Sequence, residues 1–120
     1  MKRIFSLLTI SVSLALFDSH AFAHAFLDHA MPGVGTSVAA SPSELELTFT
    51  EGVVVAFSGV RVATVSGAAI PVGRPTVGPE NTLHVRLGRP LKPGTYVVSW
   101  HVVSVDTHHT QGTYKFTVGQ

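Results

Sequence analysis

Short runs of alternating apolar and polar residues, separated by turn residues, constrain the fold of this chain more than any other feature. In residues 43–50, leucine and phenylalanine occupy one face, and glutamate and threonine occupy the other. This period of two is typical of a half-buried β-strand. Because similar runs recur at short intervals and no long amphipathic helical stretch competes with them, we predict an all-β protein, a Greek-key β-sandwich or barrel.

Further runs are predicted as strands because they are rich in β-branched and aromatic residues, with glycine or proline marking the turns between them. The longest contains the only tryptophan, Trp100, which we expect in the hydrophobic core. The step from Gln111 to Gly112 is expected to interrupt the ladder before the final strand. These predicted strands cover residues 53–57, 60–65, 69–72, 82–87, 95–105 and 113–118.

The start of the chain has the pattern of a secretory signal peptide. A short basic segment precedes a mostly apolar run, and Ala21-Phe22-Ala23 then matches the small-x-small pattern that signal peptidase cleaves. The apolar run is shorter than the roughly 20 residues that a membrane-spanning helix needs. We therefore expect a cleaved signal over residues 1–23, export to the periplasm, and one mature domain over residues 24–120. A cut two residues earlier is the alternative.

The composition of the expected mature domain limits its partners and ligands. The chain has 8 basic and 7 acidic residues, and removal of Lys2, Arg3 and Asp18 leaves six of each. With no net charge and no basic stripe, nucleic acid is not an expected partner. There is no cysteine, and Met31 would be the only methionine left, so soft ligands for copper(I) are scarce. Imidazole and carboxylate ligands are present instead.

Cleavage after Ala23 would make His24 the first residue and create a nitrogen ligand that the precursor lacks. An N-terminal histidine can chelate a metal ion through its α-amine and its ring Nδ1. Near the other end of the chain, i and i+2 alternation predicts that Asp106 and His108 face one point while His109 faces away. These nitrogen and oxygen donors suit copper(II). Because amines (ordinary pKa about 7.7–8.0) and imidazoles (about 6.5) must lose protons to coordinate, affinity should fall on acidification.

Several motifs resemble the CopC family of copper-resistance proteins. They are the start at His24, the run L-E-L-T-F-T-E ending at Glu51, P-G-T-Y-V-V-S-W ending at Trp100, and V-S-V-D-T-H ending at His108. The resemblance covers essentially the whole mature chain, in order. It implies an immunoglobulin-like β-sandwich, cupredoxin-like in outline, that binds copper in the periplasm.

The resemblance also implies a ligand set and a partner. The copper(II) ligands of that family correspond here to His24, Asp106 and His108. Glu51 corresponds to a glutamate that lies near the copper and supports its ligands. A CopD-like inner-membrane copper protein is the implied partner. The implied function is copper(II) sequestration, homeostasis or delivery to a membrane copper transporter, without enzymatic activity.

Two other functions remain as alternatives. A copper oxidative enzyme of the lytic polysaccharide monooxygenase type also binds copper through an N-terminal histidine. Such an enzyme needs an open coordination position on the copper, and Asp106 would fill that position here. A metal-free β-sandwich interaction module would bind no copper, since a fold alone does not determine function. Among the other histidines, His109 and His29 are candidate additional ligands, whereas His84 and His101 are expected to be surface or packing residues.

Overall fold

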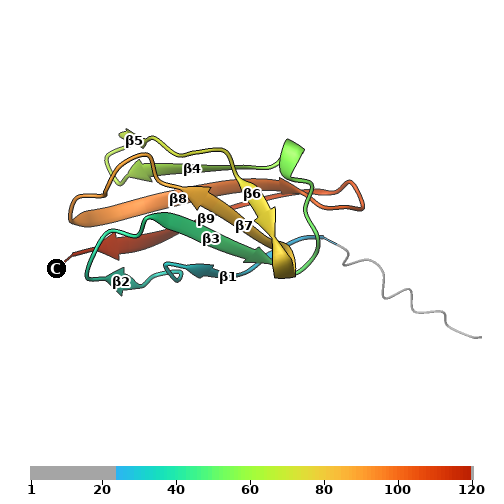
Figure 1. Cartoon of the computed structure of the whole chain (residues 1–120), viewed down its shortest axis with the longest axis horizontal. Coiled ribbons are helices and arrows are strands. Elements are labelled where there is room, and N and C mark those ends of the chain that lie inside the picture. Colours follow the sequence, from blue (N-terminus) through green and yellow to red (C-terminus); the bar gives the residue numbers. More distant parts are fainter. Residues whose placement is uncertain (1–23, 120) are drawn as a thin grey trace, which may run out of the picture.

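The computed structural model of the protein describes residues 24–119, which form two β-sheets packed face to face (Figure 1). The predicted signal peptide lies outside these residues. The described part contains no α-helix and no helix long and apolar enough to cross a membrane, and the predicted all-β sandwich is confirmed. The strands are Leu27–Met31 (β1), Ser37–Val38 (β2), Glu44–Phe49 (β3), Gly59–Thr64 (β4), Ala69–Ile70 (β5), Thr76–Gly78 (β6), Thr82–Arg86 (β7), Gly94–Val103 (β8) and His109–Val118 (β9), and two short 3-10 turns cover Val55–Phe57 (η2) and Pro79–Asn81 (η3).

The two sheets differ in size. One has four strands in the order β1-β3-β7-β6, and the other has five in the order β2-β9-β8-β4-β5. The long β8–β9 hairpin forms the centre of the larger sheet. Its loop lies at the same end of the sandwich as the start of the described chain (Figure 1). This shared end is the place where the predicted metal ligands can meet.

The core lies between the sheets and uses the alternation seen in the sequence. In β3, Leu45, Leu47 and Phe49 are buried, while the residues between them are partly exposed. Phe49 contacts Trp100 of β8 edge to face, with ring centroids 5.1 Å apart. Such a pair adds about 0.5–1.5 kcal/mol to the free energy gained by burial. Trp100 is therefore a core residue that joins the two sheets, as predicted.

Strand β9 begins earlier than the sequence pattern indicated. Gly112 does not interrupt the ladder but pairs with Trp100 inside it. A Cβ atom on Gly112 would lie 2.6 Å from Cζ2 of Trp100, so the indole covers the strand where the side chain is missing. The glycine is thus a packing position for the tryptophan, and the prediction of a break was wrong.

Residues 53–57 also differ from the prediction of a strand. Only Val53 forms a β-bridge, and the segment then turns into η2. The amide of Val54 donates to the carbonyl of Val103 at 2.8 Å, and the Ser58 hydroxyl donates to the carbonyl of Val54 at 2.8 Å. The first bond joins the segment to a distant strand and the second closes a local turn, and the β-branched pattern predicts neither of them.

Candidate metal centre

The backbone that follows His24 is held between the two sheets. The amide of Thr50 donates to the carbonyl of Phe26 at 2.8 Å, and the Phe26 amide donates to Oγ1 of Thr50 at 3.0 Å. From the other sheet, Oγ1 of Thr110 donates to the carbonyl of Ala25 at 2.6 Å. Ala25 is fully buried between these contacts. The hydrogen bonds therefore place His24 beside the β8–β9 loop.

The side chains of His24 and His108 stand against each other at this end. Their ring centroids are 4.3 Å apart, and the ring planes are perpendicular. Nδ1 of His108 lies 3.1 Å from Oδ2 of Asp106. The structure thus brings the three predicted ligands to one corner, although their ligand atoms are not all within 4.8 Å of one another.

The ring of His24 provides an unpaired polar atom. Its Nδ1 is buried and has no hydrogen-bond partner within the described part of the chain. Leaving such an atom unsatisfied costs about 1–3 kcal/mol. A metal ion would satisfy it, and Nδ1 is the ring atom that chelates together with a free α-amine. The donor set at this corner therefore fits an imidazole- and carboxylate-binding metal ion.

Asp106 and His108 lie in a turn and not on an extended strand. Strand β8 ends at Val103, two residues before the predicted end, and Thr107 has a φ of 72°. The amide of Thr107 donates to the carbonyl of Ser104 at 2.8 Å, which closes the turn. The prediction assumed that Asp106 and His108 face one point because they alternate along an extended strand, and this assumption was wrong. The turn brings the two side chains together by a different route.

Ser104 holds the carboxylate of Asp106, a contact that the sequence reasoning missed. It is 1% exposed, and its hydroxyl donates to Oδ1 of Asp106. The hydrogen bond from Ser104 is the main cause of an Asp106 pKa below the ordinary 3.8; desolvation opposes it, and contacts with His108 reinforce it. The only available signal was a serine at the end of an apolar strand, two residues before the aspartate.

We expect Ser104→Ala to weaken metal binding although it removes no ligand. Loss of the hydroxyl should raise the pKa of Asp106 toward 3.8 and free the carboxylate to rotate. Loss of a group that supports a ligand typically lowers metal affinity 10–100-fold, so we expect copper affinity to fall about tenfold. An NMR titration of the Asp106 carboxyl signal measures its pKa, and a copper(II) titration measures the affinity.

The same substitution should change the response of stability to acid. Because the pKa of Asp106 is lower in the folded protein than the ordinary value of 3.8, the ionised carboxylate stabilises the fold above pH 3.8. This contribution is lost as the pH falls through the pKa of Asp106 in the folded protein. Ser104→Ala should remove part of it, whereas Ser66→Ala, in an exposed turn, serves as the control. An unchanged Asp106 pKa and unchanged metal affinity in Ser104→Ala would contradict this role.

The other candidate residues are placed differently. Glu51 directly follows Thr50, whose hydroxyl donates to the carbonyl of His24 at 3.3 Å, but its exposed side chain makes no hydrogen bond or ion pair with the described residues. His29 contacts the neighbouring Asp28 at 2.9 Å and is exposed on β1. His109 is exposed at the start of β9. Among the described residues, none of these side chains forms a hydrogen bond, an ion pair or a ring contact with His24, Asp106 or His108.

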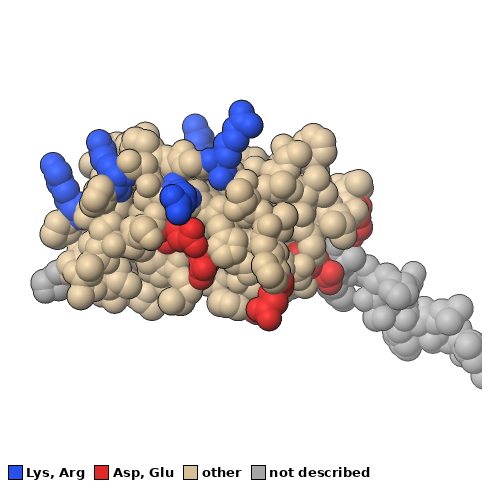
Figure 2. All heavy atoms as spheres, viewed as in Figure 1, with Lys and Arg blue, Asp and Glu red and all other residues tan. Residues whose placement is uncertain are grey.

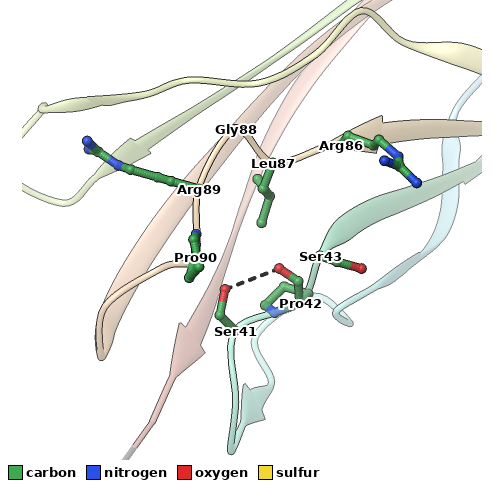
Figure 3. A pocket seen from close by; sticks show the side chains of 8 residues that line it. All are labelled: Ser41, Pro42, Ser43, Arg86, Leu87, Gly88, Arg89 and Pro90. Carbon is green, nitrogen blue, oxygen red and sulfur yellow. Dashed lines mark hydrogen bonds between the residues drawn. The ribbon is translucent and has the colours of Figure 1, made fainter.

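Outside this corner, basic and acidic side chains lie on different parts of the surface, and there is a pocket that has no metal ligands. On the face drawn in Figure 2, basic side chains lie along the upper edge and toward the left, whereas acidic side chains lie below them, from the centre to the right-hand end. Near the start of β3, residues 41–43 and 86–90 line a pocket of about 360 Å³ (Figure 3). Its lining includes Arg86 and Arg89 but no histidine or carboxylate, so it offers no metal ligand.

Comparison with known proteins identifies the family. The CopC domain profile matches residues 27–119. Protein YobA of Escherichia coli (strain K12) is 38% identical over 109 residues, which cover 89% of this chain and 88% of YobA. The crystal structure of PcoC, a methionine-rich copper resistance protein from Escherichia coli, matches with a TM-score of 0.72 and 33% identity, over 80% of this chain and 99% of PcoC.

A further relative is much longer than this chain. Copper transport protein CutJ of Bacillus subtilis is 25% identical over 122 residues, which cover 100% of this chain but 23% of CutJ. A similar domain therefore also occurs as one part of a larger transport protein. The profile match spans nearly all of the described residues. YobA and PcoC each match most of this chain and are each more than 30% identical to it. This chain belongs to the CopC family.

Proposed function

We propose that this protein binds copper(II) in the periplasm and that His24, Asp106 and His108 are its ligands once cleavage makes His24 the first residue. One observation carries the proposal: the unpaired, buried Nδ1 belongs to a ring that stands against His108, beside Asp106. The names of PcoC and CutJ, a copper resistance protein and a copper transport protein, favour copper as the metal.

The contacts of Asp106 suggest how the carboxylate joins the site. Its Oδ1 accepts a hydrogen bond from Ser104, and its Oδ2 faces Nδ1 of His108. To bind copper, the carboxylate exchanges the His108 contact for the metal while Ser104 keeps the other oxygen in place.

This donor set favours sequestration or delivery over catalysis. A carboxylate, two imidazoles and an amine fill the near-planar positions that copper(II) prefers, whereas an oxygenase keeps one of them open. Glu51 remains a candidate supporting group, since it follows the Thr50 contact with the His24 segment. Failure of Glu51→Gln to change copper affinity would exclude that role.

A membrane copper protein, CopD-like, is the proposed partner for delivery. CutJ supports this, because there a similar domain is joined to a longer copper transport protein. In this chain, two exposed apolar side chains flank the corner: Phe26, 51% exposed, lies beside His24, and Val105, 67% exposed, precedes Asp106. Apolar side chains around a charged site are suited to contact with a partner protein.

Isothermal titration of copper(II) into protein that begins at His24 tests the function. We expect one tight equivalent, with an affinity that falls on acidification because the nitrogen donors must lose protons. Absence of copper uptake would support the metal-free interaction module instead. Oxidised sugars after incubation of the copper-loaded protein with a reductant and a polysaccharide would overturn the non-enzymatic assignment.

A further inference from the structure

A second group of metal-binding side chains lies on the outer face of the four-stranded sheet. His84 of β7 pairs directly with Glu46 of β3, and Glu44 lies two residues before Glu46 on the same face. Nδ1 of His84 is 3.2 Å from Oε1 of Glu44 and 3.5 Å from Oε1 of Glu46. One ligand atom from each of the three residues lies within 4.8 Å of the other two.

These separations match those of ligands around one small ion. Two ligands that are each about 2.0 Å from a tetrahedral zinc ion lie about 3.3 Å apart. The two distances from His84 Nδ1 fall on either side of that value. One imidazole and two carboxylates therefore fit three positions of a zinc(II)-type ion, and water can take the fourth.

The charge of this group also favours a cation. Glu44 and Glu46 are partly exposed, with 36% and 41% of their side-chain areas accessible, and they converge on one histidine. Arg86 pairs with Glu44 across the ladder, but no lysine or arginine in residues 24–119 forms a salt bridge with either carboxylate. A divalent ion would balance two adjacent negative charges that otherwise repel each other.

The ring of His84 lies over Gly78 of β6. A Cβ atom on Gly78 would lie 2.7 Å from Nε2 of His84, so the ring occupies the space left by the glycine. With Nε2 against Gly78, the ring directs Nδ1 toward the two glutamates. The ring thus already presents Nδ1 to both carboxylates before any ion binds.

We propose that Glu44, Glu46 and His84 form a second metal site, which takes a divalent transition-metal ion of the zinc(II) type. Thr50, which contacts the His24 segment, lies four positions after Glu46. This is about 13 Å along an extended strand, so the ion cannot be shared with the His24 corner. The site uses no terminal amine. It therefore does not rest on the proposed copper function, and either one can fail without the other.

Zinc titration followed through the imidazole nitrogens of His84 by NMR tests this site. The full chain and the form beginning at His24 should both show saturable shifts at His84. The double variant Glu44→Gln/Glu46→Gln should lower the zinc affinity measured at His84 more than about tenfold, because loss of supporting groups alone costs 10–100-fold. His29→Gln, which removes an exposed histidine paired with Asp28, is the matched control and should leave the titration unchanged.

Two results would overturn the site. Unshifted His84 signals at millimolar zinc would show that the cluster is only a histidine–glutamate ion pair. An unchanged His84 titration in the double glutamine variant would show that zinc reaches the imidazole without the carboxylates. Circular dichroism of the variants confirms that the sandwich is folded in each comparison.

Discussion

One methionine added in front of His24 is expected to lower copper(II) affinity by roughly 10³-fold, about 4 kcal/mol. The added residue converts the α-amine of His24 into a peptide nitrogen, whose lone pair is delocalised into the carbonyl group and is therefore a poor ligand. The chelate ring between the amine and Nδ1 is lost, while the side chains of His24, Asp106 and His108 are all retained. Competition with a coloured copper(II) chelator measures the change.

A residue added after Gln120 is the control for this experiment. It lengthens the chain equally but leaves the His24 amine free, so copper affinity should not change. Thermal unfolding without copper should be the same for both extended forms, because the His24 segment is held by hydrogen bonds from the Thr50 amide and the Thr110 hydroxyl. Equal copper affinity with and without the leading methionine would exclude an amine ligand.

His108→Ala is expected to lower copper(II) affinity by about 100-fold and to change the electron paramagnetic resonance spectrum. The substitution removes the imidazole that stands 4.3 Å from the His24 ring, measured between centroids. It also removes the group that faces Oδ2 of Asp106. A loss of about 100-fold corresponds to roughly 2.8 kcal/mol. Copper titration and the nitrogen splitting of the spectrum report the effect.

His109→Ala is the matched control, since it removes the adjacent histidine. His109 is exposed at the start of β9, and among the described residues its side chain forms no ion pair or ring contact with His24, Asp106 or His108. Its removal should leave both affinity and spectrum unchanged. A spectrum altered by His109→Ala but not by His108→Ala would reverse the ligand assignment.

The strands with strong alternation were predictable, whereas their ends were not. Residues 43–50 and 82–87 became β3 and β7 with small changes at the ends, because side-chain burial imposes a period of two on each strand. The short strands β1, β2 and β6 were not predicted. They carry little alternation of their own and exist because a longer strand offers them hydrogen-bonding partners.

The candidate copper site was predictable as a set of residues but not as an arrangement. His24 and the D-x-H motif stand out because the chemistry of copper(II) requires those residue types. The turn at Thr107 and the buried hydroxyl of Ser104 leave almost no trace in sequence, because they depend on backbone bonds between separate segments. His84 was expected to be an ordinary surface residue, yet pairing of β7 with β3 places it between two glutamates.

The sequence by itself determined the β-rich character of the chain, the apolar face of each long strand and the kinds of ligand available. These properties are local, since they depend on residues a few positions apart. Only the tertiary structure decided that His24 meets His108 and that His84 meets Glu44 and Glu46. The reason is physical: strand register is set by which faces are buried together across the whole sandwich, and no local segment contains that information.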